Sequence, residues 1–172
     1  ASRNPGPGGK VKLDIVSGFL GAGKTTFIQK LIPELYSGEN VVVLENEFGE
    51  ISLDGETLSA AGITVESICA GCICCKGAGE LSRNIITIVE KYQPERIVIE
   101  PTGLAMLSEI KSLLAEPCLA GKCEVDHVIT IVDARNYERR MMISQAFFTN
   151  QIQHSEVVFL SKSEGLSPSR ID

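Results

Sequence analysis

A glycine-rich turn between a short apolar run and a helical pattern constrains the fold of this chain more than any other feature. Residues Val11–Val16 are mostly apolar, and the turn that follows carries Gly18, Gly23, Lys24 and Thr25 in the spacing G-x-x-x-x-G-K-[ST]. Apolar residues then recur at helical spacing. Glycines at these positions let backbone N–H groups turn towards phosphate oxygens at the start of a helix. The segment is therefore typical of a loop that binds the phosphates of a nucleoside triphosphate.

The polar residues of this loop have distinct tasks in such a site. Lys24 can reach the β- and γ-phosphates, and the Thr25 hydroxyl can bind Mg²⁺. An incidental glycine-rich turn is the alternative, but both the spacing and the strand–loop–helix context favour phosphate binding. The candidate nucleotide-binding residues here are Gly21, Ala22, Gly23, Lys24, Thr25 and Thr26.

Apolar, β-branched runs alternate with helical patterns along the rest of the chain. The expected strands are Val11–Val16, Val41–Leu44, Ile97–Ile99, Val128–Val132 and Val157–Leu160. The expected helices are Thr25–Tyr36, Gly79–Tyr92, Met106–Leu114 and Asn136–Phe148. Near-continuous apolar strands suit a sheet that is covered on both faces. The pattern predicts an α/β fold, a three-layer P-loop sandwich with a mainly parallel sheet and helices on both faces.

Composition narrows the classes of partner. The net charge is −6 and no block of Lys or Arg occurs, which argues against nucleic-acid binding through phosphate neutralisation. No apolar run approaches the ~20 residues of a membrane span, so we expect a cytoplasmic protein with no membrane contact. Residues 1–10, rich in Pro and Gly, are expected to be a flexible leader outside a domain over 11–172. The end of the sequence, LSPSRID, suggests a piece of something longer.

Carboxylates follow two of the expected strands. The segment Glu45-Asn46-Glu47-Phe48-Gly49-Glu50 could hold a metal or respond to the γ-phosphate, or it could be a solvated acidic loop. Glu100 ends a buried strand, the expected position of a carboxylate that contacts the Mg²⁺ shell or orients water. Gly103 allows close backbone approach to the γ-phosphate. A simple Pro-Gly turn after the strand is the alternative for this second segment.

Four of the six cysteines fall within seven residues. The thiols of Cys72, Cys74 and Cys75 can converge on one soft or borderline cation such as Zn²⁺, with a fourth ligand from elsewhere. Cys69-x-x-Cys72 also fits a redox-active dithiol. The spacing favours a metal site over a redox site.

The segment Ser161-Lys162-Ser163-Glu164 follows the last expected strand. It stands where guanine-specific GTPases carry Asn-Lys-x-Asp, whose aspartate accepts two hydrogen bonds from guanine. Ser161 and Glu164 replace both end residues of that pattern, so the segment alone is weak evidence for guanine.

Taken together, these motifs resemble the CobW-like GTPases of the CobW, HypB and UreG group. The resemblance runs in the family's order over residues 11–165, through ENEFGE, GCICC, EPTG, Val132-Asp133-Ala134 and SKSE. It implies a GTPase that binds a transition metal, usually zinc, and delivers it to a client metalloprotein. The resemblance assigns catalysis to Lys24 and Glu100, and Mg²⁺ binding to Thr25. It assigns nucleotide contacts to Gly103, Ser161, Lys162 and Glu164. The metal ligands are then Cys72, Cys74 and Cys75, with Glu45 and Glu50 as auxiliary metal contacts.

The resemblance also implies a mechanism and its rivals. Mg²⁺ and the γ-phosphate would order residues 45–54 and shift the cysteine site, and turnover would be slow because no arginine finger is identifiable. Family members usually carry a separate C-terminal domain, and we expect it to be absent from this sequence. A nucleotide- or metal-dependent homo-oligomer is a further option. The competing functions are a nucleotide-regulated redox or metal sensor and a P-loop ATPase or small-molecule kinase.

Overall fold

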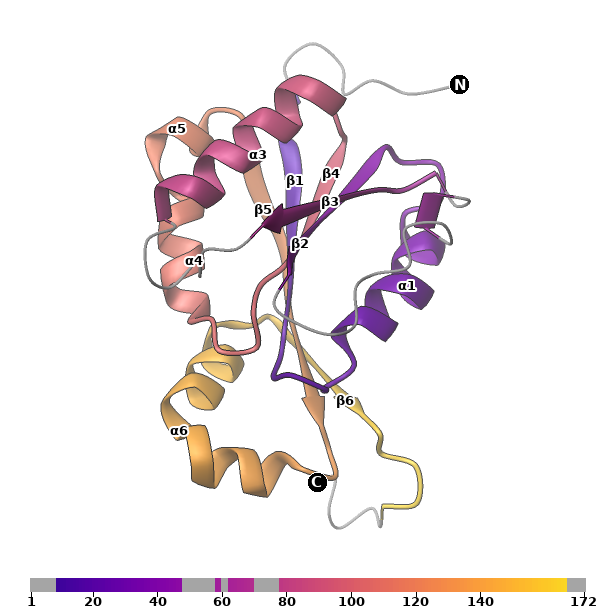
Figure 1. Ribbon diagram of the computed structural model, residues 1–172, viewed down its shortest axis with the longest axis vertical. Coiled ribbons are helices and arrows are strands. Elements are labelled where there is room, and N and C mark those ends of the chain that lie inside the picture. The colour runs from indigo at the N-terminus through magenta and orange to yellow at the C-terminus, as the bar shows by residue number, and fades with distance from the viewer. Residues whose placement is uncertain (1–8, 48–57, 60–61, 70–77, 167–172) are drawn as a thin grey trace.

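Six parallel strands form one sheet in the order β3-β2-β4-β1-β5-β6 (Figure 1). The computed structural model describes residues 9–47, 58–59, 62–69 and 78–166. The strands are β1 (Val11–Ser17), β2 (Val41–Glu47), β3 (Thr64–Cys69), β4 (Arg96–Glu100), β5 (Cys123–Asp133) and β6 (Val157–Ser161). The helices are α1 (Lys24–Leu35), α3 (Ala78–Tyr92), α4 (Leu107–Leu114), α5 (Pro117–Ala120) and α6 (Tyr137–His154).

Helices cover both faces of the sheet. Helix α1 lies on one side, and α3, α4 and α6 lie on the other (Figure 1). The side chains of β5 show how one strand serves both layers: Ile129 and Ile131 join the core under α1, whereas Val128 joins the core under α3 and α4. Each strand of the interior is therefore apolar on both faces, as a parallel sheet between two helical layers requires. The predicted three-layer α/β sandwich is confirmed.

The expected elements are all present, with some differences at their limits. The sheet is wholly parallel, and the edge strand β3 and the short helix α5 were not expected. Strand β3 reads TVESIC and pairs with β2 alone, so its sequence lacks the continuous apolar run of an interior strand. Strand β5 begins at Cys123, earlier than the expected start at Val128. Its first half, CEVDH, was not recognised as strand because it is polar on alternate residues.

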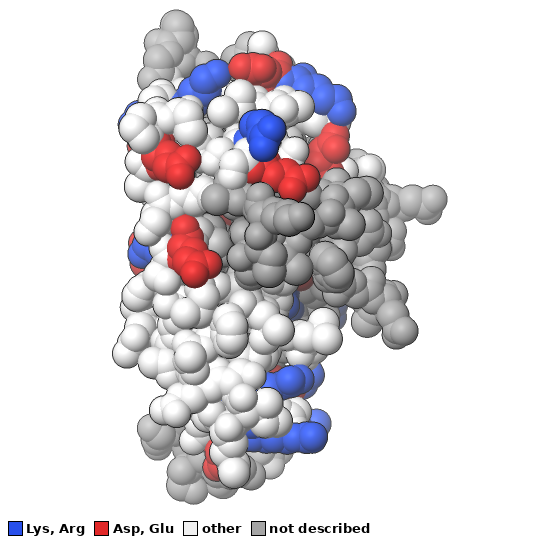
Figure 2. All heavy atoms as spheres, turned by 60° about the vertical axis from the view of Figure 1, so that its left-hand side comes forward, with Lys and Arg blue, Asp and Glu red and all other residues white. Residues whose placement is uncertain are grey.

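Charged side chains are interspersed on the face that Figure 2 draws. Lys and Arg stand beside Asp and Glu at the upper end of this view, and uncharged residues cover much of its lower left. Among the described helices, none is long and apolar enough to cross a membrane.

Two close approaches between backbones position the loop that follows β1. Gly18 has a φ of +142°, and a Cβ at this position would meet the Ile131 carbonyl oxygen of β5 at 2.3 Å. Gly103, in the loop after β4, lies so close that a Cβ would meet the Leu20 nitrogen at 2.6 Å. The loops after β1 and β4 are thus packed main chain against main chain at the same edge of the sheet.

Gly18→Ala should therefore lower the free energy of unfolding by about 2 kcal/mol or more, since both its φ and its contact with β5 exclude a side chain. Gly121→Ala is the matched control: this residue has a φ of −77° and no atom within 4 Å of an added Cβ. Alanine there should be neutral or stabilise by about 0.4–1 kcal/mol. Urea denaturation measures both, and equal values for the two variants would contradict the packing argument.

Candidate nucleotide-binding site

The carboxyl ends of the strands bring the predicted site residues to one edge of the sheet. Glu45 of β2 is in register with Glu100 of β4, and Asp133 of β5 is in register with Ser161 of β6. The glycine-rich loop begins at the same edge, directly after Ser17. In open α/β sheets, ligands bind in the crevice beyond these strand ends.

The loop delivers an uncapped helix N-terminus to this edge. Helix α1 begins at Lys24, its N-cap is Gly23 with a φ of 105°, and no side chain caps its first turn. No acidic residue lies in that turn either. The first backbone N–H groups of a helix have no partner within the helix and favour an anion. The geometry is that of a phosphate-binding loop.

The Lys24 side chain is folded back into this loop. It is only 7% exposed, and its ammonium group donates to the carbonyl oxygens of Gly18 at 2.8 Å and Phe19 at 3.3 Å. Burial lowers the pKa of Lys24, and the nearby Glu100 carboxylate acts in the opposite direction. Within the described residues this buried cation is held by carbonyl oxygens and a neighbouring carboxylate, and it is well placed to bind phosphate oxygens.

Glu100 faces Lys24 across the site. The pKa of the Glu100 carboxyl is raised, chiefly by burial and further by the Glu45 carboxylate. Lys24 and a hydrogen bond with the Thr25 side chain act in the opposite direction. Glu45 itself is 6% exposed. A hydroxyl and two carboxylates are the hard oxygen ligands that Mg²⁺ prefers, and a cation would offset the proximity of the two carboxylates. Thr25 and Glu100 therefore fit a Mg²⁺ ion, with the Glu45 carboxylate nearby.

The SKSE segment, residues 161–164, contacts the phosphate loop through side chains that donate to main-chain carbonyl oxygens. The Ser161 hydroxyl donates to the Ala22 carbonyl oxygen at 2.5 Å. The Lys162 ammonium donates to the Gly21 carbonyl oxygen at 2.6 Å and to Asp133 at 2.8 Å. Glu164 is exposed, and its main-chain carbonyl accepts from Arg135 at 3.1 Å. Two residues of this segment thus contact the loop, whereas Glu164 does not reach it.

Some predicted residues lie outside the described part of the chain. These are Glu50, Cys72, Cys74 and Cys75. Strand β3 ends at Cys69, in register with Glu47 at the end of β2. Thr26 is exposed on α1.

Two residues of α6 make site contacts that could not be found from the sequence. The guanidinium of Arg140 donates to the Leu20 carbonyl oxygen at 3.2 Å and lies 5.6 Å from the centre of the Phe19 ring. The side-chain amide of Gln151 donates to the carbonyl oxygens of Gly103 and Ala105. Both partners are over 40 residues distant, and α6 carries no motif that marks them.

Comparison with known proteins decides the family. The model of the CobW/HypB/UreG nucleotide-binding domain matches residues 12–171. The chain belongs to the CobW/HypB/UreG family.

Individual relatives agree with this family assignment. The zinc chaperone YeiR of Escherichia coli (strain K12) is 31% identical over 91% of this chain and 48% of its own length. The zinc chaperone YjiA of the same strain is 30% identical over 90% of this chain and 50% of its own length. The crystal structure of Zn(II)-bound YjiA GTPase from E. coli has a TM-score of 0.64 at 24% identity, over 90% of this chain and 50% of that one, and so shares the fold. The chain spans about half the length of the curated relatives it matches.

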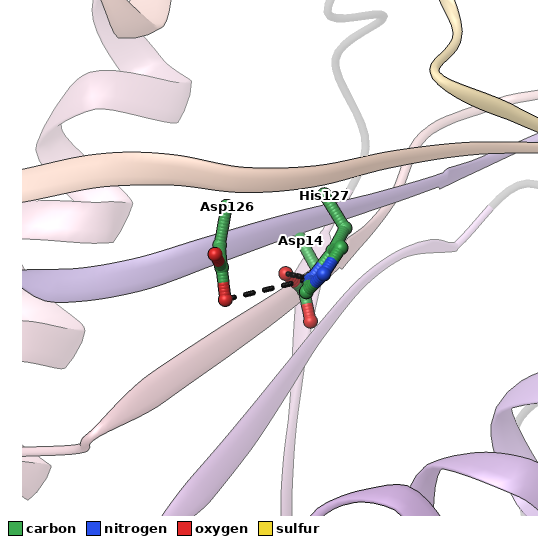
Figure 3. Close-up of side chains that lie close together, drawn as sticks. All are labelled: Asp14, Asp126 and His127. Atoms are coloured by element: carbon green, nitrogen blue, oxygen red, sulfur yellow. Dashed lines mark hydrogen bonds and ion pairs between the residues drawn. The ribbon is translucent and has the colours of Figure 1, made fainter.

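A second cluster of polar residues lies towards the other end of the same strands. Asp14 of β1 lies beside Asp126 and His127 of β5, and one ligand atom from each lies within 4.8 Å of the others (Figure 3). The pairing of β1 with β5 shifts register at this point, because Leu13 faces Val125 whereas Asp14 faces His127. The irregularity brings both β5 side chains to the face that carries Asp14.

Arg96 already pairs with both carboxylates of this cluster. Its Nη1 donates to both oxygens of Asp14 at 2.8 Å and to Asp126 at 2.9 Å. Its Nε donates to Glu39 at 3.0 Å, and its guanidinium lies 4.0 Å from the centre of the Tyr36 ring. A metal ion would have to displace this buried cation. The CobW/HypB/UreG domain described here therefore holds a structural ion network at this end of the sheet.

Arg96→Met should destabilise the fold by about 3–5 kcal/mol, because it leaves the wholly buried Asp14 carboxylate without its cation. Lys122→Met is the control, since it breaks the exposed pair with Glu90 and should change stability by no more than about 0.5 kcal/mol. Urea denaturation of both variants checks this. A small loss for Arg96→Met would show that the network contributes little.

Proposed function

We propose that this chain is the GTP-binding and GTP-hydrolysing module of a zinc chaperone, which delivers zinc to a client metalloprotein. The observation that carries the proposal is the buried Lys24 ammonium, placed in an uncapped glycine-rich loop beside Glu100. The choice of zinc as the metal rests on the relatives YeiR and YjiA, which are named zinc chaperones.

Each site residue has a role in this proposal. The phosphates bind to the loop, with Lys24 exchanging its carbonyl partners for the β- and γ-phosphates, while Gly103 approaches the γ-phosphate. Ser161, Lys162 and Glu164 form the side that faces the base. The nucleotide-binding residues are then Gly21, Ala22, Gly23, Lys24, Thr25, Thr26, Gly103, Ser161, Lys162 and Glu164.

The buried charges support hydrolysis at this site. Lys24 and Glu100 are the catalytic residues of the proposal: Lys24 offsets charge on the phosphates, and Glu100 orients water. Thr25 and Glu100 would hold Mg²⁺, which when bound supplies further positive charge at the phosphates. Glu100 is partly buried, and a hydrogen bond with the Thr25 side chain holds its carboxylate. We expect a low intrinsic rate.

The zinc site of the proposal consists of Cys72, Cys74 and Cys75, with Glu45 and Glu50 as auxiliary contacts. Its support is the register between Glu47 and Cys69, since strands β2 and β3 end side by side at the edge where the phosphate loop begins. Cys69 precedes Cys72 by three residues in the sequence. A change at the end of β2 that accompanies GTP binding would therefore affect the neighbouring end of β3, at Cys69.

Guanine specificity separates this proposal from a P-loop ATPase. We expect GTP to compete better than ATP, with ITP between them, because inosine keeps N1–H but lacks the exocyclic amine. The preference should be smaller than a full Asn-Lys-x-Asp pattern gives, since Glu164 has an extra methylene. Equal competition by ATP and GTP would favour the ATPase.

Lys24→Ala should lower GTP affinity by about 10- to 100-fold, the size of a lost charge-assisted contact. Lys122→Ala serves as control, since its exposed ammonium pairs with Glu90 on the surface. Equilibrium titration with GTP and Mg²⁺ measures both. Near-normal binding by Lys24→Ala would refute the phosphate-loop assignment.

Reduced protein should bind about one Zn²⁺ per chain and release thiol protons, because thiolates are the ligands. Cys74→Ser should weaken binding far more than Cys118→Ser, whose thiol is exposed and free in the described structure. Competition with a chelator of known affinity gives the constants. Equal effects of the two substitutions would favour a redox role for the cysteines.

A further inference from the structure

Helix α6 holds the loop that follows β4 through one buried side chain. Gln151 is 1% exposed, and its side-chain amide nitrogen donates to the carbonyl oxygens of Gly103 at 3.0 Å and Ala105 at 3.2 Å. An amide NH₂ has two protons to donate, and both are used here. The backbone carbonyl of Gln151 in turn accepts from Thr130 of β5 at 3.2 Å, which ties this point of α6 to the sheet.

The two carbonyls that Gln151 binds belong to the turn that packs on the phosphate loop. Gly103 lies so close to the phosphate loop that an added Cβ would meet the Leu20 nitrogen at 2.6 Å. A buried carbonyl without a donor is costly, so loss of the Gln151 amide would shift this turn or leave its oxygens unpaired. The position of Gly103 relative to the phosphate loop thus depends on Gln151.

We infer that Gln151 is a positioning residue that sets the Gly103 turn for recognition of the γ-phosphate, and so determines how strongly the site prefers GTP to GDP. The inference rests on the proposed function. Among the described residues, the Gln151 side chain donates to the two carbonyls and not to the phosphate loop itself, so we expect it to act through these carbonyls. Its effect should therefore fall on the γ-phosphate, which GDP lacks, and leave the α- and β-phosphate contacts of the loop intact.

The neighbouring residue provides a matched control on the same helix. Asn150 donates to the Ser108 hydroxyl at 2.8 Å and accepts from the Ser108 backbone N–H at 3.3 Å, at the start of α4. It makes as many hydrogen bonds as Gln151 but none to the Gly103 turn. Conversion of each amide to the acid of the same shape removes donors at one place and keeps the helix the same.

The experiment compares Gln151→Glu with Asn150→Asp. Affinities for a non-hydrolysable GTP analogue and for GDP are measured with Mg²⁺ by equilibrium titration. In Gln151→Glu a carboxylate faces two carbonyl oxygens, so the preference for the GTP analogue over GDP should fall about tenfold, with GDP affinity little changed. Asn150→Asp should keep the wild-type ratio, because its carboxylate can still accept from both Ser108 groups. Gln151→Met, which keeps the length of the side chain without its donors, should reproduce the loss if Gln151→Glu does not fold.

The outcomes separate the two proposals. A wild-type chain that binds neither nucleotide would refute the proposed function. A wild-type chain that binds both, with an unchanged GTP-to-GDP ratio in the Gln151 variants, would overturn only the role of Gln151 and leave it as a residue that stabilises the fold. A ratio that falls equally in Asn150→Asp would also overturn it, since the effect would then belong to α6 in general.

Discussion

The site depends on main-chain packing that only glycine permits. The phosphate loop lies against β5 at Gly18, and the turn after β4 lies against the phosphate loop at Gly103, with no room for a Cβ at either place. The loops after β1 and β4 and the strand β5 are thereby in direct main-chain contact, without side chains between them. This close packing holds the loop in the shape in which its backbone N–H groups and Lys24 can bind a phosphate chain.

The same strands carry two buried charge clusters with different degrees of compensation. Arg96 donates to both Asp14 and Asp126, so the cluster towards the amino ends of the strands is matched within the protein. At the carboxyl ends, Lys24 relies largely on neutral carbonyl oxygens, and the pKa of Glu100 is raised by its burial. A buried charge that is held mainly by neutral groups favours a ligand that completes it, whereas a charge already paired inside the protein leaves less for a ligand to complete. This difference distinguishes the candidate site from the cluster that only resembles a metal site.

The sequence was sufficient for the fold and for the local part of the site. The phosphate loop, Glu100 and Ser161 each follow a strand that is apolar on both faces, and periodicity identifies such strands. Strand β3 was missed because its residues are mixed in polarity at the edge of the sheet. Arg140 and Gln151 were missed for another reason: helical spacing places them on α6 but does not say which distant carbonyl each one meets. Glu50, Cys72, Cys74 and Cys75 lie outside the described residues, so those assignments stay predictions.

Helix α6 contacts both the phosphate loop and the Gly103 turn. The backbone of Ser144 departs from helical geometry and divides α6 into two halves. The first half contacts the phosphate loop through Arg140, and the second holds the Gly103 turn through Gln151. The chain then enters β6 and the Ser161 segment, which binds the phosphate loop again from the other side. A shift of the Gly103 turn on nucleotide binding would change its contact with Gln151, near the C-terminus of α6. The N-terminal part of the same helix contacts the phosphate loop through Arg140. The irregular backbone at Ser144 separates the half of α6 that contacts the phosphate loop from the half that holds the Gly103 turn.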